Sequence, residues 1–293
     1  MKKSTLIIKL GALGDMIQAM SMFKILCQQY ENNLTLLTTE PFVDLARRTG
    51  YFKTIICDNR KSIRSTLSMI KQVRAYSFDH IIDLQNVDRT RLYKILLTGS
   101  YRAWIAPCRI NKENHPFKRF KHLCKTQNWP TLPPVDITTM AEPLLNEPTL
   151  PYALIIAGAS NAHGGQKRWC QKKYAALCNH IIKQGITAVL VGSKSDHLDE
   201  LAALCPDAIN LIGQTSLYQL ISLGLNATYC IGNDTGPQLI IAASGCPTIT
   251  LFSALNPPNK GGAWPWNKER HLNLYKDNLN DLSVEDVIDA LKF

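Results

Sequence analysis

The sequence predicts an α/β protein made of two doubly wound, Rossmann-like domains. Short apolar runs alternate with helical patterns along the chain, and the alternation restarts after a proline-rich stretch near residue 148. Strands that alternate with helices form a parallel sheet, because each helix returns the chain to the end of the sheet where the next strand begins. A length of 293 residues also suits two domains of about 150 residues each. We therefore expect one domain over residues 1–148 and a second over residues 149–293.

The first half of the chain is predicted to contain five strands with helices between them. The runs with strand character cover residues 5–10, 34–38, 54–57, 79–84 and 102–105. The segments with helical character cover residues 16–30, 41–50, 60–76 and 88–97, and the third of these is basic on one side. Between Met16 and Tyr30 the apolar residues recur at the spacing of an amphipathic helix.

Residues 108–129 are basic and rich in aromatic side chains. The cations of this segment are Arg109, Lys112, Lys118, Arg119, Lys121 and Lys125. Such a segment can be a contact surface for an anionic partner, or a solvated amphipathic helix whose long side chains cover an apolar stripe. The sequence leaves these two interpretations open.

The second half repeats the alternation of strands and helices. Its strands are predicted at residues 153–157, 187–191, 209–212, 228–231 and 248–252, and its helices at residues 171–184, 196–205, 216–224, 238–244 and 284–291. The last helix follows a sequence similar to a capping box that begins at Ser283. Ligands of doubly wound sheets bind at the carboxyl ends of the strands, so we expect the site in a cleft between the two domains.

Composition limits the possible partners. The formal net charge is +10, a surplus that favours phosphate-bearing substrates or a membrane surface. No RNA- or DNA-binding motif accompanies the basic residues, so nucleic acid is not expected. The nine cysteines include no C-x-x-C pair, which indicates reduced thiols in a cytoplasmic protein. No apolar run reaches the roughly 18 residues of a membrane-spanning helix, so any membrane contact is expected to be peripheral.

Two glycine turns occur where a predicted strand passes into a predicted helix. Asn233-Asp-Thr-Gly-Pro237 follows one apolar run, and Gly11-Ala-Leu-Gly-Asp15 follows another. A turn of this kind directs backbone N–H groups and a helix N-terminus at one point, which suits a phosphate. Asp234 and Thr235 would then be the side chains nearest the ligand. Asp15 is either a first-turn helix acid or a general base.

The loop at residues 158–169 is rich in glycine and ends in Lys167, Arg168 and Trp169. It lacks the Gly-Lys-Ser/Thr of a P-loop, but Lys167 beside a helix N-terminus could neutralise a departing diphosphate. A basic surface loop is the alternative interpretation. His163, in the same loop, has no second metal ligand near it in the sequence, so no metal site is expected.

A nicotinamide cofactor is a further alternative for the turn at Gly11. That turn lacks the third glycine of the dinucleotide-binding fingerprint, although Glu40 lies near the end of the second strand, where a ribose-binding acid can sit. The missing glycine argues against this cofactor.

Taken together, these stretches resemble the ADP-heptose:lipopolysaccharide heptosyltransferases, glycosyltransferase family 9. The matching pieces keep the family's order; they are Ile8-Lys-Leu-Gly-Ala-Leu-Gly-Asp15, Ile82-Asp-Leu-Gln85, Lys167-Arg-Trp169, Gly192-Ser193, Asn233-Asp-Thr-Gly-Pro237, Pro247 and Phe252. The resemblance implies the GT-B fold, with two Rossmann-like domains facing each other across a cleft. It also implies an N-terminal acceptor-binding domain, a C-terminal nucleotide-sugar-binding domain, and a final helix at residues 283–291 that packs back onto the first domain.

The same resemblance implies an inverting transfer of heptose from ADP-heptose to a lipopolysaccharide core acceptor, with no cofactor and no metal. Asp15 and Lys167 match the catalytic base and the diphosphate-contacting lysine of the family. Donor-binding residues would be Ser160, Lys167, Asp234, Thr235 and Gly236, and acceptor-binding residues would be Gly11, Gly14, Arg60, Arg64 and Gln85. The acceptor carries carboxylates and phosphates that such arginines can bind, at the cytoplasmic face of the inner membrane.

Three positions depart from the family's pattern. Leu239 stands where a histidine often follows the donor turn, Tyr218 where an acid often meets the donor ribose, and Cys170 where a proline usually follows the tryptophan. The first two positions concern donor recognition. They leave open another nucleotide-sugar donor, an epimerase of the same fold, or a non-catalytic relative.

Overall fold

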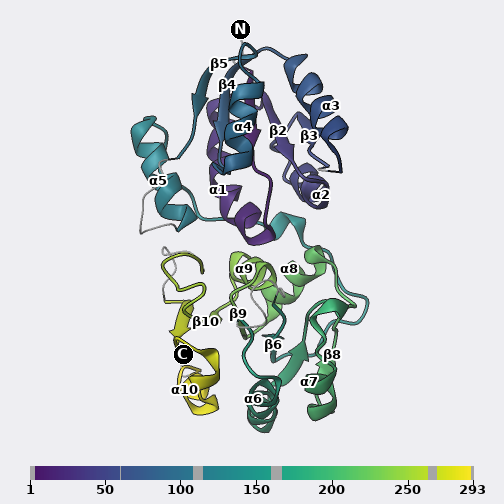
Figure 1. Cartoon of the computed structure of the whole chain (residues 1–293). Helices are drawn as coiled ribbons and strands as arrows, with labels where there is room; N and C mark the ends of the chain where they lie inside the picture. The colour runs from purple at the N-terminus through teal and green to yellow at the C-terminus, as the bar shows by residue number, and fades with distance from the viewer. Residues whose placement is uncertain (1–3, 60, 108–114, 160–166, 263–268, 292–293) are drawn as a thin grey trace. The chain divides into compact units, whose positions relative to one another are not determined.

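The structure, a computed structural model, describes residues 4–59, 61–107, 115–159, 167–262 and 269–291. The chain divides into two compact units, Met1–Val135 and Asp136–Phe293. Each unit contains one parallel sheet with helices on both of its faces (Figure 1). The α/β class with two Rossmann-like domains is therefore confirmed.

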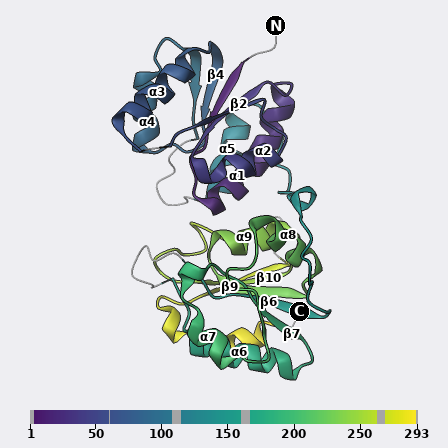
Figure 2. The same ribbon diagram turned by 90° about the vertical axis from the view of Figure 1, so that its right-hand side faces the viewer.

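The sheet of the first unit has five strands in the order β3-β2-β1-β4-β5, all parallel. The strands are β1 (Thr5–Ile8), β2 (Leu34–Thr38), β3 (Thr54–Cys57), β4 (Phe78–Asp83) and β5 (Tyr101–Ile105). The helices are α1 (Leu13–Gln29), α2 (Val43–Arg48), α3 (Ile63–Arg74), α4 (Asp88–Leu96) and α5 (Pro116–Thr126). Figure 2 shows α3 and α4 on one side of this sheet, and α1, α2 and α5 on the other.

The sheet of the second unit has six parallel strands in the order β11-β10-β9-β6-β7-β8. The strands are β6 (Tyr152–Ile156), β7 (Thr187–Leu190), β8 (Ile209–Asn210), β9 (Tyr229–Asn233), β10 (Thr248–Phe252) and β11 (His271–Tyr275). The helices are α6 (Gln171–Lys183), α7 (Asp199–Leu204), α8 (Leu217–Asn226), α9 (Gly236–Ala243) and α10 (Val284–Asp289). Counted from β6, this is the 3-2-1-4-5-6 strand order of a Rossmann fold.

Helices cover both faces of each sheet, so the central strands have no face toward solvent. Every residue of β1, β2, β6, β9 and β10 is buried. A parallel sheet covered on both faces needs nearly continuous apolar strands. This requirement explains why these strands stand out in the sequence as uninterrupted apolar runs.

The boundary between the units lies between Val135 and Asp136, whereas the prolines predict it near residue 148. The intervening residues pack on the second unit: a 3-10 turn at Thr138–Met140 contacts α8. The N–H of Glu142 donates to the carbonyl of Tyr218 at 3.1 Å, and Ser222 Oγ donates to the carbonyl of Glu142 at 2.5 Å. Proline removes a backbone donor but does not prevent packing, so a proline-rich stretch can lie within a compact unit.

The last helix, α10, packs within the second unit. Val287 is buried in the core of this unit, and α10 contacts α6. The N–H of the Trp169 indole donates to the carbonyl of Leu282, just before the helix, at 3.0 Å. The expected packing of this helix onto the N-terminal domain stays a prediction.

The basic segment at residues 108–129 contains an amphipathic helix, α5. Phe120, Leu123 and Cys124 are its buried residues, and the helix contacts α1. Its lysines, Lys118, Lys121 and Lys125, are exposed. Arg109 and Lys112 lie outside the described residues. The helical interpretation is thus confirmed, and a contact role for the lysines stays a prediction.

Among the residues that the structure describes, no helix is long and apolar enough to cross a membrane.

Candidate functional site

The candidate residues follow the central strands of the two sheets. In the first unit, β1 and β4 are the neighbours at which the strand order reverses, and Gly11 to Asp15 follow β1. In the second unit, β6 and β9 are the corresponding neighbours, and the Asp234–Gly236 turn follows β9. In doubly wound sheets, ligands bind at such switch points, outside the carboxyl ends of the strands.

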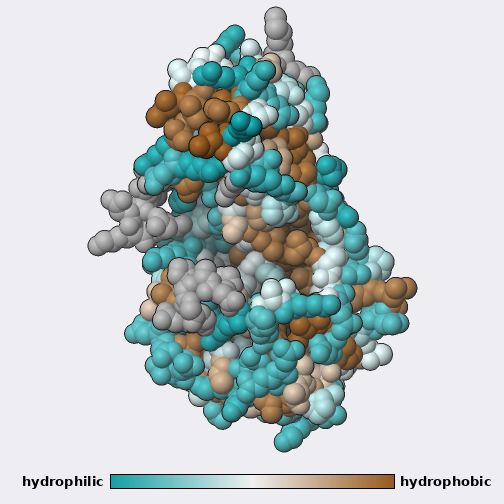
Figure 3. All heavy atoms as spheres, turned by 45° about the vertical axis from the view of Figure 1, so that its right-hand side comes forward, coloured by the Kyte–Doolittle hydropathy of each residue, from teal (hydrophilic) through white to brown (hydrophobic). Residues whose placement is uncertain are grey.

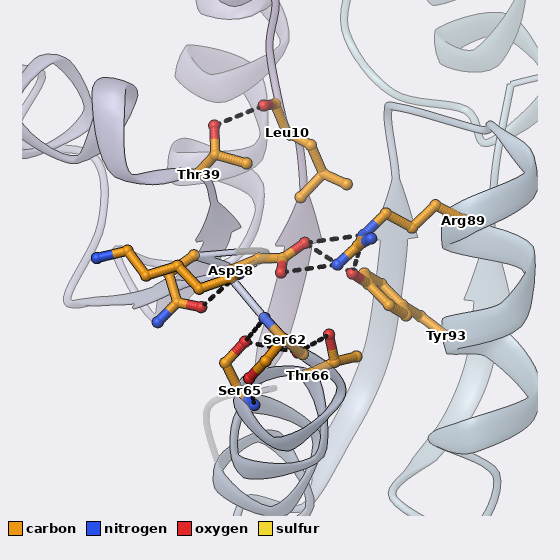
Figure 4. Close-up of polar contacts among 10 residues, drawn as sticks. Leu10, Thr39, Asp58, Ser62, Ser65, Thr66, Arg89 and Tyr93 are labelled. Carbon is orange, nitrogen blue, oxygen red and sulfur yellow. Dashed lines mark hydrogen bonds and ion pairs between the residues drawn. The ribbon is translucent and has the colours of Figure 1, made fainter.

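Two hydrogen bonds hold the turn after β1. The N–H of Leu10 donates to Gln85 Oε1, beyond β4, at 3.0 Å. Thr39 Oγ1, beyond β2, donates to the carbonyl of Leu10 at 2.9 Å, as Figure 4 shows. Gly11 has a φ of +121°, and a Cβ atom there would lie 2.4 Å from Phe42 Cε2. Glycine is therefore required at this position both by its backbone conformation and by the space available.

Asp15 lies in the first turn of α1, and 42% of its side chain is exposed. Lys9 Nζ donates to Asp15 Oδ2 at 3.3 Å. Burial lowers the pKa of Lys9, while the negative charges of Asp15 and Asp83 act in the opposite direction. A carboxylate that is held by a buried lysine and still partly exposed can accept a proton from a ligand.

Asp83 orients the predicted acceptor residue Gln85. Asp83 Oδ1 accepts hydrogen bonds from the N–H of Gln85 at 3.1 Å and of Asn86 at 2.8 Å. Burial raises the pKa of Asp83, and these two bonds act against that shift. Asp83 is part of the Ile82–Gln85 motif, but the motif alone does not indicate this role. The feature of the sequence that could have indicated this role is the position of Asp83 at the end of a strand.

The structure brings some of the predicted acceptor residues together. Gly11, Gly14 and Gln85 lie around the end of β1, near Asp15. Arg64 is exposed in the first turn of α3, beyond the outer strand β3, and is not part of this group. Arg60 lies outside the described residues.

The turn after β9 places Asp234, Thr235 and Gly236 at the N-terminus of α9. Pro237 lies in the first turn, where its missing N–H costs nothing. Thr235 is the N-cap residue, yet its side chain makes no capping bond. Among the described residues, its buried Oγ1 has no hydrogen-bond partner. A buried hydroxyl beside a helix N-terminus can donate to a phosphate oxygen.

Lys167 and Asp234 line one small pocket of the second unit, together with Phe252, Ser253 and Asn256. Burial raises the pKa of Asp234, and the positive charge of Lys167 and a hydrogen bond from Asn256 oppose this shift. Asn256 Nδ2 donates to Asp234 Oδ2. The structure thus brings these two predicted donor residues together, whereas Ser160 lies outside the described residues.

Asn233 joins the segment after β6 to the turn after β9. Its Oδ1 accepts hydrogen bonds from the N–H of Trp169 and from Tyr174 Oη, both at 3.1 Å, and its Nδ2 donates to the carbonyl of Ala157 at 2.7 Å. Asn233 is fully buried. Because it fixes Trp169, it also determines where Lys167, two residues earlier, can lie. Asn233 stands in the Asn233–Pro237 motif, but the motif alone does not indicate this role.

Arg168 and Asp196 also hold the segment after β6 in place. Arg168 Nε donates to the carbonyl of Ala159 and Arg168 Nη1 to that of Asp196, both at 3.0 Å. The N–H of Ser193 donates to Asp196 Oδ2 at 2.7 Å. A Cβ atom on Gly158 would lie 2.4 Å from the Asp196 carboxyl group, so a larger residue there would displace the Asp196 side chain. Arg168 therefore has a structural role next to Lys167.

Two of the residues that depart from the family's pattern lie near the donor turn, and both side chains are buried. Tyr218, on α8, and Leu239, on α9, are less than a tenth exposed. Cys170 is the N-cap residue of α6, with a φ of −57° that a proline could also adopt. Tyr218 and Leu239 are therefore part of the packing of α8 and α9.

Within the described part of the chain, no three His, Cys, Asp or Glu side chains gather where they could hold a metal ion.

Comparisons with known proteins identify heptosyltransferases as relatives of this chain. The lipopolysaccharide core heptosyltransferase OpsX of Haemophilus influenzae is 20% identical to this chain over 94% of the chain and 86% of its own length. The lipooligosaccharide heptosyltransferase 2 of the same species is 34% identical, but that match covers only 32% of this chain and 29% of the relative. The solved structure of the Escherichia coli heptosyltransferase WaaC with ADP-2-deoxy-2-fluoro heptose matches with a TM-score of 0.75, covers 99% of both chains and is 17% identical, which supports the fold.

The family model of glycosyltransferase family 9 (heptosyltransferase) matches residues 112–289, more than half of the 293 residues. This range includes Lys167 and the turn at Asp234, so the match contains the site of the second unit. The chain therefore belongs to glycosyltransferase family 9, the heptosyltransferase family, and is a glycosyltransferase.

Proposed function

We propose that this glycosyltransferase transfers heptose from ADP-heptose to an anionic lipopolysaccharide core acceptor, with inversion at the anomeric carbon and without a metal ion. The observation that carries the proposal is the second-unit site, where Lys167 and Asp234 line one pocket and Asp234 is followed by Thr235, whose buried hydroxyl lies at the N-terminus of α9. These groups suit the diphosphate of a nucleotide-sugar. The family membership and the similarity to OpsX and WaaC favour ADP-heptose as that donor.

In the proposed reaction the acceptor hydroxyl oxygen attacks the anomeric carbon of the donor. The new glycosidic C–O bond forms while the bond to the diphosphate oxygen breaks, and ADP departs with the electron pair. Asp15 accepts the proton of the hydroxyl. Its partial exposure and its contact with Lys9 support this role. A single displacement of this kind inverts the anomeric configuration.

The departing diphosphate gains negative charge as the bond breaks. Lys167, the N–H groups of the Thr235–Gly236 turn and the Thr235 hydroxyl would stabilise that charge. In this proposal Ser160 also binds the donor, and these positive groups take the place of a divalent cation.

The acceptor would be bound by the first unit. Gly11, Gly14 and Gln85, at the end of β1 like Asp15, would contact the acceptor, and the cations Arg60 and Arg64 would bind its carboxylates or phosphates. The enzyme would act at the cytoplasmic face of the inner membrane, where its lipid-linked acceptor is made.

The test is a transfer assay with purified protein, ADP-heptose and a lipopolysaccharide core acceptor, with and without a metal chelator. We expect a product whose new linkage has the opposite anomeric configuration to the donor, formed at an unchanged rate in the chelator. A product that retains the donor's configuration, or a rate that the chelator abolishes, would overturn the inverting, metal-independent mechanism.

A second experiment tests Lys167. We expect Lys167→Ala to weaken binding of ADP-heptose by roughly tenfold or more and to slow transfer, since a charge-assisted contact to a phosphate contributes about 1.5–3 kcal/mol. Lys183→Ala, which removes an exposed lysine of α6, is the matched control. Equal donor affinity in both variants would refute the role of Lys167.

The buried Tyr218 and Leu239 favour a second candidate, a related enzyme with a different donor. A panel of ADP-, UDP- and GDP-sugars, read by thermal shift, would identify the ligand that stabilises the native state. Product analysis then distinguishes the classes, because an epimerase converts its donor without an acceptor and a non-catalytic relative binds a donor without turnover.

A further inference from the structure

An apolar groove runs between α3 and α4 on the surface of the first unit. It has a volume of about 360 Å³ and is lined by Ser62, Ile63, Thr66 and Leu67 from the α3 side and by Arg89, Leu92, Tyr93 and Leu96 from α4. Figure 3 shows a brown patch at the upper left, over these two helices. The exposed fractions of the apolar lining residues are 81% for Ile63, 56% for Leu67 and 50% for Leu92. Ile95, also on α4, is 69% exposed.

These side chains are not required by the core of the unit. On α3 the buried residues are Met69, Ile70 and Val73, which pack toward the sheet. Ile63 and Leu67 are four residues apart and lie on the outer side of the helix. Contiguous exposed apolar side chains are rare on soluble proteins and mark interaction surfaces.

The floor of the groove is held in place by a partly buried ion pair. Arg89 Nη2 lies 3.1 Å from Asp58 Oδ1, and Tyr93 Oη donates to Asp58 Oδ2 at 2.6 Å (Figure 4). Asp58 is 1% exposed. At the groove's end, Ser62 caps α3 in a reciprocal capping box with Ser65. The groove is therefore formed by fixed side chains.

The apolar surface continues into a cationic one. At 3.6 residues per turn, Ile63, Leu67, Lys71 and Arg74 form one stripe along α3. The helix carries Arg64, Lys71 and Arg74 and contains no acidic residue. On α4, Arg91 and Lys94 are also exposed.

We infer that the groove and this stripe are a docking surface for an anionic phospholipid bilayer. A helix with apolar residues on the same face as lysine and arginine binds at the lipid interface, where apolar groups enter the acyl region and cations meet the headgroups. Charge complementarity argues against a second copy of the chain, because two copies would bring the same cations together. The inference concerns membrane attachment and does not depend on the transfer reaction.

The test is sedimentation of the full-length protein with vesicles. We expect binding to vesicles of phosphatidylcholine with phosphatidylglycerol, and much weaker binding to phosphatidylcholine alone. The double variant Ile63→Ser, Leu67→Ser should bind the anionic vesicles at least about tenfold more weakly. The matched control is Leu145→Ser with Leu150→Ser, two exposed leucines of the second unit, which should bind like the wild type. Circular dichroism would check that each variant is folded.

A second pair of variants tests the charge. Lys71→Glu with Arg74→Glu should weaken binding to anionic vesicles by roughly tenfold or more, since each cation at such a surface contributes about 1 kcal/mol. Lys172→Glu with Lys183→Glu, on α6, is the control of equal charge change. Equal binding by the groove variants and their controls would overturn the inference. The inference would also be overturned if the protein did not bind vesicles and instead formed a concentration-dependent dimer in light scattering. The double variant Ile63→Ser, Leu67→Ser would then abolish that dimer.

Discussion

At the residue scale, Asp15 has the most direct test. Replacing it with Asn keeps the size of the side chain but removes the group that accepts the proton. Because general-base catalysis typically contributes 10²–10⁴ in rate, we expect Asp15→Asn to lower turnover by roughly a hundredfold or more. Donor affinity should change little, since Asp15 is not part of the second-unit donor site. Initial rates of product formation and calorimetric titration with ADP-heptose measure the two quantities.

The control for this variant is Asp44→Asn. Asp44 is an exposed acid of α2 in the same unit, and it pairs with Arg48 at 3.0 Å. Its replacement should leave both turnover and donor affinity near their wild-type values. If Asp15→Asn also kept normal turnover, Asp15 would be only a first-turn helix acid.

Asn233 carries the second residue-scale prediction. Asn233→Ala leaves the N–H of Trp169, the Tyr174 hydroxyl and the carbonyl of Ala157 without their buried partner. Since each of these three unsatisfied buried polar groups costs about 1–3 kcal/mol, we expect the free energy of unfolding to fall by roughly 3 kcal/mol or more. Urea denaturation would measure it. Affinity for ADP-heptose should fall too, because Trp169 positions Lys167.

Tyr174→Phe is the matched comparison. It removes only the hydroxyl that donates to Asn233, so we expect a loss of about 1 kcal/mol and nearly normal donor affinity. If Asn233→Ala kept full donor affinity despite its lower stability, Asn233 would contribute to folding and not to the placement of Lys167.

The contrast between Asp15 and Asn233 shows what a sequence can reveal at this scale. Asp15, Lys167 and Asp234 follow glycine-rich turns, which are local features of the chain. The role of Asn233 depends on Ala157, Trp169 and Tyr174, which are more than 50 positions away along the chain. Such a network exists only after the sheet has formed, and a single sequence carries no sign of it.

At the element scale, the strongly apolar strands were predicted and the edge strand β11 was missed. β11 pairs with β10 along only one side. Of its five residues only His271 is buried. An edge strand that faces solvent needs no apolar run, so its sequence resembles a loop. The groove on α3 was missed for a related reason, since exposed Ile63 and Leu67 look like core residues until the helix is placed on the sheet.

His271 gives β11 a measurable pH dependence. Burial, together with the positive charge of Arg270, lowers the pKa of His271 from 6.5 to about 4 in the folded protein. Between these values the unfolded chain binds the proton more readily, so the free energy of unfolding should fall as the pH drops from 6.5 toward 4. At about 1.4 kcal/mol per pKa unit, the loss would be up to roughly 3 kcal/mol.

The variant His271→Asn tests this dependence. Asparagine does not titrate and can still hydrogen-bond Thr248, which lies 2.9 Å from His271 Nδ1. Urea denaturation at several pH values should show the wild type losing its advantage over the variant as the pH falls. Two curves that stay parallel over this range would contradict the assignment.

At the scale of the whole molecule, both sheets place their candidate residues by the same rule. The turn after β1 and the turn after β9 each lie at the point where the strand order reverses. The sequence predicts this much because strand order follows from regular alternation and from the right-handed crossover. The boundary between the units was less predictable, because it depends on which unit residues 136–148 contact.

This boundary leads to a prediction about the second unit in isolation. The chain of residues 136–293 includes its own sheet and core, and it retains the segment that packs on α8. We expect it to fold with a single cooperative transition and to bind ADP. A chain of residues 149–293 loses buried Ile137 and Met140 and the hydrogen bonds of Glu142 to α8. At about 1.5–3 kcal/mol for each buried side chain, it should be less stable by roughly 3 kcal/mol or more. Urea denaturation of the two chains side by side measures the difference, and equal stability would place the boundary near residue 148 after all.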